Sequence, residues 1–435
     1  MHYFYDFKGF KSANIDLLRP MTLLIGRNGS GKTNVIEGVE LLAQLASGRP
    51  LHEISEVGRG GGNAFEIRGG LSGCMRKKGE DHYIPFGLAF DTVYLENKIP
   101  ISYRIDIDFI PPKILKEVLF YNKKNYFEAS IKKNSDDLLN ITYDNFSRGG
   151  KKPITQLPAN RSILSRYDSV IAPLYEKKKS KVALNEAMTV ASLVIDHLKS
   201  AYVFDFHPLL MRQYESISSV KLNRHGSNLS AVLNAIKQYD ETQEESQQLL
   251  PKILDTLKQL PEEPYTGFEF FTTPTNHVLF ALKREDGSFI DASLLSDGTL
   301  RALAILVALE TVPAGSRIII EELDNGIHPS RAKLLVDTIW ECSRRRKLNV
   351  LATTHNPATL NGLTAEQLDC VEVCHYDSAE QADKITPLSK LPFSDVLLQK
   401  GQLGDLMTQN VLETYLMPNF ERDQKNKVES WLELF

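Results

Sequence analysis

Residues 21–38 read MTLLIGRNGSGKTNVIEG. The run MTLLI at 21–25 has the length and apolar character of a buried strand, and the pattern NVIEGVELLAQLA at 34–46 has helical periodicity. Between them lies a loop of the form G-x-x-x-x-G-K-[ST], in the strand-loop-helix context that this motif requires. We therefore expect a nucleotide-phosphate site where the strand meets the helix.

The residue types of the loop explain this chemistry. Glycines let the backbone turn successive N–H groups toward an anionic phosphate, and the following helix N-terminus favours negative charge. Lys32 is expected to reach the β- and γ-phosphates of ATP, and the Thr33 hydroxyl to bind Mg²⁺. A chance glycine-rich turn is the alternative, which the flanking strand and helix disfavour. The predicted nucleotide-binding residues of the segment are Gly26, Asn28, Gly29, Ser30, Gly31, Lys32, Thr33 and Asn34.

A second motif, RIIIEE at 317–322, is a β-branched strand that ends in two adjacent carboxylates. Because side chains alternate along a strand, we expect the two carboxylates to point apart. Glu321 is then predicted to bind the Mg²⁺ ion together with Thr33, and Glu322 to act as the general base that orients water. The alternative is a strand that ends in a solvated acidic turn. The phosphate loop upstream favours catalysis.

The segment LLSDGTL at 294–300 resembles the LSGGQ signature of ABC ATPases. Ser296 matches the signature serine and Gly298 the second glycine, while Asp297 replaces the usual first glycine. Such departures disfavour transporters and are familiar in the SMC, RecF and OLD-type branch. The resemblance implies that Ser296, Asp297 and Gly298 bind the γ-phosphate held by an opposite protomer. A simple helix N-cap is the alternative, and both roles are compatible.

Two further segments fit this branch. DNGIHP at 324–329 resembles its D-loop, and His355 in TTHNP resembles the H-switch, whose histidine contacts the γ-phosphate. A lone histidine after a strand is more often structural, but the order of the motifs favours the switch. We find no Q-loop glutamine, since Gln44 lies too early and residues 63–71 contain none.

The predicted fold is α/β: a P-loop NTPase head of the ABC type with a mixed or parallel core sheet, an antiparallel β subdomain and a helical insertion. A length of 435 residues favours two lobes. Alternating segments between 86 and 143 predict the antiparallel sheet, and helical periods dominate from 185 to 260. We expect head segments at 1–110 and 266–375, a basic and helical insertion at 111–265, and a tail at 376–435.

Within the helical block, residues 186–204 and 227–239 read as helices, with Pro251 and Pro261 as helix breakers. Strands are expected to return at 267–273, 277–284 and 349–355. Because strands alternate with helices in the last third of the chain, we expect its sheet to be parallel.

Composition and charge bear on nucleic-acid binding, disulfide bonds and membrane spans. The net charge is −4, yet residues 113–181 carry 15 Lys and Arg against 7 Asp and Glu. Such a stretch suits nucleic-acid phosphates, although charge runs are more often solvated faces. The 4 cysteines are too few and too scattered for a disulfide framework, and no apolar run is long enough to cross a bilayer. We expect a reduced, cytoplasmic protein.

The motifs together resemble the AAA-like, AbiEii-type ATPases of the OLD and RecF group. The resemblance implies an ATP-hydrolysing switch that works as a homodimer or higher homo-oligomer through its nucleotide sites. It also implies an anti-phage complex that senses or holds DNA and controls a separate effector, such as a nuclease. A RecF-like DNA-repair clamp is the alternative, and an ABC transporter subunit is disfavoured. Three further segments, 204–212, 226–233 and 401–406, also resemble segments of these proteins. Core packing is the favoured explanation for them.

Overall fold

The structure is a computed structural model, and it forms two compact units. The first unit contains residues 1–18, 28–201 and 374–385, and the second contains 19–27, 202–373 and 386–435. The residues that the structure describes are 1–55, 67–77, 83–94, 98–132, 137–147, 149–176, 181–244, 248–259, 265–391, 394–417 and 420. The predicted breaker Pro261, part of the segment 63–71 and the end of the tail therefore lie outside the described residues.

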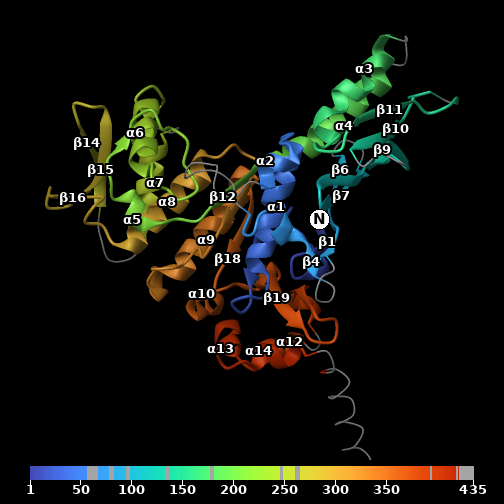
Figure 1. Cartoon of the computed structure of the whole chain (residues 1–435). Coiled ribbons are helices and arrows are strands. Elements are labelled where there is room, and N and C mark those ends of the chain that lie inside the picture. The colour runs from blue at the N-terminus through green and yellow to red at the C-terminus, as the bar shows by residue number, and fades with distance from the viewer. Residues whose placement is uncertain are drawn as a thin grey trace, which may run out of the picture. The chain divides into compact units, whose positions relative to one another are not determined.

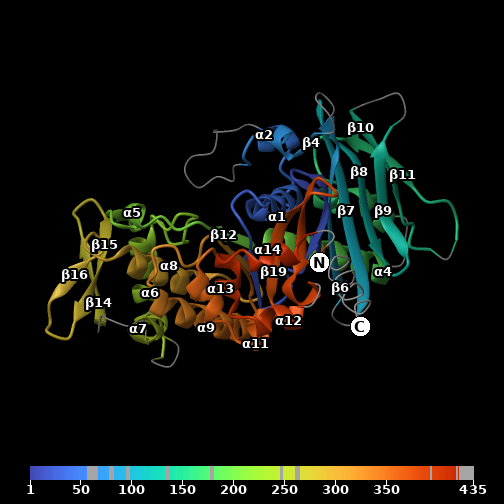
Figure 2. The same ribbon diagram turned by 90° about the horizontal axis from the view of Figure 1, so that it is seen from below.

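The first unit is built on antiparallel strands that pair in the order β11-β10-β9-β8-β7-β6-β1-β2. Figure 2 shows β7, β8 and β9 running side by side in this sheet. The hairpins confirm the antiparallel sheet predicted between residues 86 and 143. Its strands are β1 (His2–Phe7), β2 (Phe10–Ile15), β6 (Phe86–Tyr94), β7 (Ile99–Phe109), β8 (Pro112–Tyr121), β9 (Lys124–Ile131), β10 (Leu138–Tyr143) and β11 (Ile154–Pro158), with a small hairpin of β4 (Arg76–Lys77) and β5 (Tyr83–Ile84).

The helices of the first unit are α1 (Lys32–Ala46), α2 (Leu51–Ser55), α3 (Tyr167–Glu176) and α4 (Lys181–Lys199), with short 3-10 turns η1 (Ser72–Cys74) and η2 (Leu164–Arg166). Figure 1 shows α3 and α4 beside the antiparallel strands. The predicted helix over 186–204 is wrong at its end, because α4 stops at Lys199 and residues 201–204 form a strand. That strand is β12 (Ala201–Phe204), and three of its four residues belong to the second unit.

The core of the second unit is a parallel sheet in the strand order β3-β18-β17-β12. β3 (Met21–Ile25), β18 (Asn349–Thr353) and β17 (Arg317–Ile320) pair in parallel, which confirms the parallel sheet predicted for the last third of the chain. Every residue of β3 and β17 is buried. β19 (Val371–Asp377) pairs with the other edge of β3 through its first three residues, and β20 (Ala382–Pro387) pairs with β2 in the first unit.

Helices and a second, smaller sheet complete the second unit, and Figure 1 shows α8 and α9 beside its parallel strands. The helices are α5 (Pro208–Met211), α6 (Leu229–Asp240), α7 (Leu249–Gln259), α8 (Asp297–Thr311), α9 (Pro329–Arg346), α10 (Pro357–Asn361), α11 (Ala365–Leu368), α12 (Ser394–Gln399), α13 (Leu403–Thr408) and α14 (Val411–Tyr415), with the turn η4 (Leu388–Lys390). The second sheet contains β13 (Glu215–Ser216), β14 (Tyr265–Thr272), β15 (His277–Arg284) and β16 (Phe289–Asp291).

The sequence predicted Pro251 as a helix breaker, and this prediction is wrong. Pro251 lies in the first turn of α7. A proline is tolerated there, since the N–H groups of a first helical turn have no partner within the helix. α8 is buried almost all round, so it forms the centre of the apolar core of the second unit.

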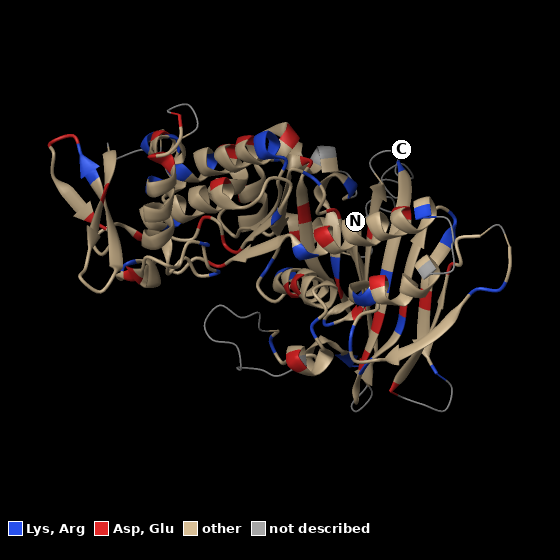
Figure 3. Cartoon of the chain, turned by 90° about the horizontal axis from the view of Figure 1, so that it is seen from above, with Lys and Arg blue, Asp and Glu red and all other residues tan. Residues whose placement is uncertain are grey.

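The basic stretch 113–181 does not form a uniformly basic face in its described part. Lys116 pairs with Glu128, and Lys124 pairs with Asp144. Figure 3 shows basic and acidic residues interleaved on the antiparallel strands. All 4 cysteines are buried, and none of them forms a disulfide bond. The expected reduced state remains a prediction. The described residues include no helix that is long and apolar enough to cross a membrane.

Candidate functional site

The phosphate loop has the backbone that its sequence predicts. Gly26, Gly29 and Gly31 have φ values of 143°, 79° and 97°, a region that favours glycine. Gly31 is the N-cap of α1, and no side chain caps that helix. The hydroxyl of Ser30 is buried without a hydrogen-bond partner among the described residues. Uncapped N–H groups and an unpaired buried hydroxyl suit a phosphate group, so the loop fits ATP.

The predicted loop residues lie at the start of α1. Lys32 is its first residue and is buried, while Thr33 and Asn34 are half-buried. Gly26 belongs to the second unit, and residues 28–34 belong to the first. The predicted roles of Lys32 toward phosphate and of Thr33 toward Mg²⁺ remain predictions.

The paired carboxylates follow β17, which ends at Ile320. The backbone N–H of Glu321 donates to the carbonyl of Phe204 in the neighbouring strand β12 at 2.9 Å. Glu322 has φ of 47°, so the chain makes a left-handed turn at this residue. Strand alternation was therefore the wrong reason for expecting the carboxylates to diverge, because both residues lie beyond the strand. A non-glycine residue in this conformation stores strain of about 1–3 kcal/mol, as functional sites often do.

Both carboxylates have polar neighbours in the second unit. Arg224 Nη2 lies 3.0 Å from Glu321 Oε1. Asn325 Nδ2 donates to Glu322 Oε2 at 3.1 Å, and the backbone N–H of Glu322 donates to the hydroxyl of Thr353 at 2.8 Å. These contacts hold Glu322 at the exposed end of the strand, where a water molecule can reach its carboxylate.

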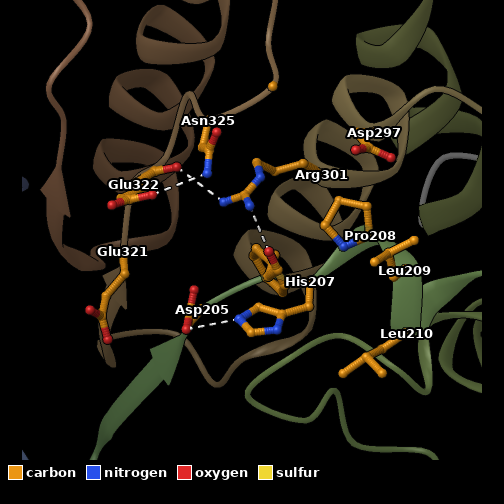
Figure 4. Close-up of a pocket in the computed structure, with 12 residues that line it drawn as sticks. Asp205, His207, Pro208, Leu209, Leu210, Asp297, Arg301, Glu321, Glu322 and Asn325 are labelled. Atoms are coloured by element: carbon orange, nitrogen blue, oxygen red, sulfur yellow. Dashed lines mark hydrogen bonds and ion pairs between the residues drawn. The ribbon is translucent and has the colours of Figure 1, made fainter.

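A buried arginine on α8, Arg301, donates a hydrogen bond to the turn at Glu322. Arg301 donates to the carbonyl of Glu322 at 3.1 Å and to the carbonyl of Phe206 at 2.7 Å (Figure 4). Burial lowers the pKa of the Arg301 guanidinium, and the carboxylates nearby, Asp205 first, oppose that shift. Arg301 thus links α8 both to the turn at Glu322 and to the segment that follows β12.

The signature segment forms the start of α8. The Ser296 hydroxyl accepts a hydrogen bond from the N–H of Thr299 at 3.1 Å, so Ser296 is the N-cap. A Cβ atom at Gly298 would lie 2.7 Å from the carbonyl oxygen of Gly326, so only glycine fits this approach to the D-loop turn. Asp297 pairs with Arg212 at 2.7 Å. The helix start predicted here is confirmed, and the contact with a γ-phosphate remains a prediction.

The turn after Glu322 is anchored by Asp324. Burial raises the pKa of this carboxyl group, although hydrogen bonds from Thr354 and Thr359 oppose the shift. His355 directly follows Thr354 and the buried strand β18, as the sequence predicted. Its charge interaction with Asp324 places it beside this turn. The role of His355 toward a γ-phosphate remains a prediction.

An open pocket of about 610 Å³ lies beside the paired carboxylates and Asp297 at the start of α8. Figure 4 shows Glu321 and Glu322 on one side of it, with Asp205 and His207 below and Asp297 on the start of α8. Its lining residues are Asp205, Phe206, His207, Pro208, Leu209, Leu210, Asp297, Arg301, Glu321, Glu322, Asn325 and Gly326.

Sequence reasoning missed several residues of this site. Arg301 had a visible signal, because it is a charged residue inside the apolar helix LRALAILVALE. Arg224 and Asp205 had none, since no local pattern connects them with a strand a hundred positions later. The strand β12, which brings Asp205 beside Glu321, was hidden inside a predicted helix.

A phosphate loop alone is shared by many nucleotide-binding proteins. Here the capped signature helix also touches the turn that follows the paired carboxylates, as expected for an ABC-type head. The fold is thus that of a P-loop NTPase. The family described as "AAA domain, putative AbiEii toxin, Type IV TA system" matches residues 21–361, and the chain belongs to this family.

Curated relatives support the branch over short stretches. DNA replication and repair protein RecF of Gloeobacter violaceus is 39% identical over 56 residues, which are 13% of this chain and 15% of that protein. RecF of Desulfitobacterium hafniense is 36% identical over 79 residues, or 18% of this chain and 21% of the relative. The chain thus matches about a fifth or less of the length of these relatives.

Two solved structures are similar over most of the chain at low identity. The SMC head domain from Thermotoga maritima gives a TM-score of 0.40 at 11% identity, over 89% of this chain and 97% of that one. An SMC head bound to the C-terminal winged-helix domain of ScpA gives a TM-score of 0.46 at 11% identity, over 88% and 95%.

Proposed function

We propose that this protein is an ATP-gated switch that works as a homodimer. In this proposal each protomer's phosphate loop holds ATP, and the signature segment of the partner completes the site. The supporting observation is an exposed surface around the start of α8. Leu294, an apolar residue, is 75% exposed, and Ser296, Asp297, Asn325 and Gly326 are exposed as well.

This surface suits a second copy of the chain for two reasons. An interface here would remove the apolar side chain of Leu294 from water, which favours association. The exposed start of α8, a helix of 15 residues, also offers a positive dipole end to an anionic phosphate. An interface here would bring the signature and D-loop segments of one protomer to the nucleotide of the other.

Each predicted residue has a chemical role in this proposal. Lys32 and the loop N–H groups stabilise negative charge that develops on the phosphates. Glu322 accepts a proton from the attacking water, and His355 contacts the γ-phosphate. Thr33 and Glu321 would hold Mg²⁺, which would neutralise phosphate charge when bound. Catalysis would then rest on positioning and electrostatics.

The dimer is tested with a variant that binds ATP and hydrolyses it slowly. We expect Glu322→Gln to elute as a dimer in size-exclusion chromatography with light scattering when ATP and Mg²⁺ are present, and as a monomer without ATP. Adding Ser296→Arg should abolish the dimer while ATP binding persists, since the bulky cation would occupy the signature surface. Dimer formation by the double variant would contradict the assigned interface.

The same experiment includes a control for nucleotide binding. Lys32→Ala removes the cation of the phosphate loop, so it should lose both ATP binding and the ATP-dependent dimer. If Glu322→Gln binds ATP and stays monomeric at every concentration tested, the gated dimer is wrong, although ATP binding itself stands.

We further propose that the switch belongs to a bacterial anti-phage complex, in which it senses or holds DNA and controls a separate effector protein. The description of the matched family, with its toxin and toxin–antitoxin terms, supports this role. A pull-down from the native host with tagged Glu322→Gln and ATP should enrich one effector protein. The matched pull-down with Lys32→Ala should not enrich it.

A DNA-repair clamp is the second candidate, favoured by the similarity to RecF proteins. The two functions differ in what accompanies the ATPase. Stimulation of ATP hydrolysis by DNA, without an effector in the pull-down, would favour the clamp. Loss of protection against phage on deletion of the gene would favour defence.

A further inference from the structure

Three side chains that commonly bind metal ions meet at the edge of the pocket. Asp205 and His207 follow strand β12, and His225 lies in the loop before α6. One ligand atom from each of the three residues lies within 4.8 Å of the others. Among the described residues no other such group of three or more forms. Figure 4 shows the Asp205 carboxylate and the His207 ring facing each other, with Glu321 nearby.

Backbone hydrogen bonds hold the two segments of this group together. The N–H of Asp205 donates to the carbonyl of Arg224 at 2.9 Å, and the N–H of His207 donates to the carbonyl of His225 at 3.1 Å. The segments 205–207 and 224–225 are thereby fixed side by side. The three side chains are positioned by the fold before any ion arrives, which lowers the entropic cost of binding one.

The loop that carries His225 is itself tightly packed. Gly226 has φ of 72°, and a Cβ atom there would lie 2.6 Å from Met211 Cε and 3.0 Å from Phe206 Cδ1. Asn228 Nδ2 donates to the carbonyl oxygens of Ser219 and Lys221. Segments 204–212 and 226–233, which resemble segments of related proteins in sequence, thus pack against each other beside Asp205, His207 and His225.

The histidine geometry is also that of a metal ligand. His225 Nδ1 lies 3.1 Å from the carbonyl oxygen of Asp205, which can only accept a hydrogen bond. In the tautomer that makes this hydrogen bond, Nδ1 carries the proton and Nε2 has the lone pair that a metal needs. A ring N–H that donates to a backbone carbonyl is the usual support of a metal-binding histidine. His207 Nε2 and Asp205 Oδ2 are 3.1 Å apart and share a hydrogen bond in the absence of an ion.

We propose that Asp205, His207 and His225 form a binding site for one divalent transition-metal ion of the Zn²⁺ class. Two imidazoles and one carboxylate suit such ions, whereas Mg²⁺ and Ca²⁺ prefer sets of oxygen ligands. Asp205 and His207 line the open pocket, so an ion can reach them from solvent. The site shares no ligand with the predicted Thr33–Glu321 magnesium site and does not rest on the proposed function.

The position of the site gives the ion a structural effect. Arg224 directly precedes His225, and its carbonyl accepts the hydrogen bond from the N–H of Asp205 at 2.9 Å. Its guanidinium lies 3.0 Å from Glu321 Oε1. An ion bound to Asp205 and His225 would therefore link the two residues that flank the backbone of Arg224. Metal binding therefore stiffens segments 205–207 and 224–226 and steadies the contact between Arg224 and Glu321.

Zinc binding to the full-length protein tests the proposal. Protein stripped with a chelator is titrated with ZnCl₂ against a chromophoric zinc indicator, in excess MgCl₂. We expect one zinc per chain for the wild type. His207→Ala and His225→Ala should each weaken binding by more than the roughly 10–100-fold that loss of a hydrogen bond supporting a ligand costs. His277→Ala is the matched control, because among the described residues the ring of His277 bonds only to Thr275. This variant should bind zinc as the wild type does.

Two further measurements keep the test decisive if an alanine variant folds poorly. Asp205→Asn preserves the size of the side chain and should still weaken zinc binding. X-ray absorption at the zinc edge of the wild type should show nitrogen and oxygen ligands, including imidazole, and no sulfur. Sulfur in the shell, unchanged binding by the double histidine variant, or no zinc bound by the wild type would each overturn the proposal. Slower hydrogen exchange at 205–207 and 224–226 with zinc would support it.

Discussion

Glu117 in the first unit and the carboxylates after β17 in the second unit place the same chemical group in two different settings. Glu117 lies in β8 and is fully buried. Its carboxylate accepts hydrogen bonds from the Tyr103 and Ser162 hydroxyls at 3.0 and 2.8 Å and from the N–H groups of Ile163 and Leu164 at 2.7 and 2.8 Å. All four donors belong to the protein's own chain, so the buried group stabilises the fold and has no access to a ligand.

The carboxylates of the second unit are arranged in the opposite way. Glu322 is exposed, and among the described residues its carboxylate bonds only to Asn325. Its buried neighbour Asp324 accepts bonds from two threonines and serves the turn. The comparison shows that burial and hydrogen bonding separate a structural carboxylate from one free to do chemistry, although both stand out in sequence only as Glu or Asp. Carboxylates of the two kinds should therefore respond differently to substitution.

The largest effect is expected at Glu322. Glu322→Gln keeps the hydrogen-bonding size of the side chain and removes its basicity, so phosphate release should fall by about 100- to 10,000-fold while folding is unchanged. Steady-state phosphate release and thermal melting measure the two effects. The surface variant Glu285→Gln serves as the matched control and should leave both unchanged. A loss of less than about tenfold would show that Glu322 is not the general base.

Glu117 should show the reverse pattern. Glu117→Ala leaves four donors buried without an acceptor, so we expect the free energy of unfolding to fall by about 3–5 kcal/mol. Urea unfolding measures this loss, and ATP hydrolysis per folded molecule should stay at the wild-type level. Full stability of the variant would mean that water replaces the carboxylate.

A smaller effect is expected at Gly298, where the second unit brings two backbone segments together. Gly298→Ala would push a Cβ atom against the carbonyl of Gly326, which has no flexible side chain to move aside. The expected cost is about 1–3 kcal/mol of unfolding free energy. Gly267→Ala is the control, since a Cβ atom there meets nothing within 4 Å. Equal stability of the two variants would contradict the close approach.

The smallest effect is a dependence on pH. Burial raises the pKa of Glu117 above its ordinary value of 4.5, although four hydrogen bonds oppose the shift. Between these two pKa values the folded state keeps a proton that the unfolded state has lost, so stability falls as pH rises. Glu117→Gln cannot titrate and should lose this slope, which urea unfolding across a pH series would reveal.

The pKa of Asp377 is shifted in the opposite direction to that of Glu117. Its hydrogen bond with Lys384 lowers the pKa of Asp377 below 3.8, so its contribution is present above that value and lost as pH falls. Asp377→Asn should therefore flatten the acid side of the stability profile. A steeper slope in either variant than in the wild type would show that the assigned shift has the wrong sign.

The sequence predicted the parts of the site that lie in short motifs. The phosphate loop, the start of α8 and the positions of Glu322 and His355 after buried strands were found because local patterns require particular residue types there. The left-handed turn at Glu322 was not found, since any residue is formally allowed after a strand. The pairing of β12 with β17 was also missed, because the helical period of α4 runs up to residue 199 and masks the short strand that follows.

Residues far apart in sequence set the order in which the chain can fold during synthesis. Strand β3 pairs with β18, where Met21 opposes Val350, and with β19, where Leu23 opposes Val371. At about 5–20 residues per second the ribosome takes roughly 15–65 s to make the intervening chain. Throughout that time the buried strand β3 has been made without its partners in the sheet. The phosphate loop that follows β3 therefore gains its final support only near the end of translation.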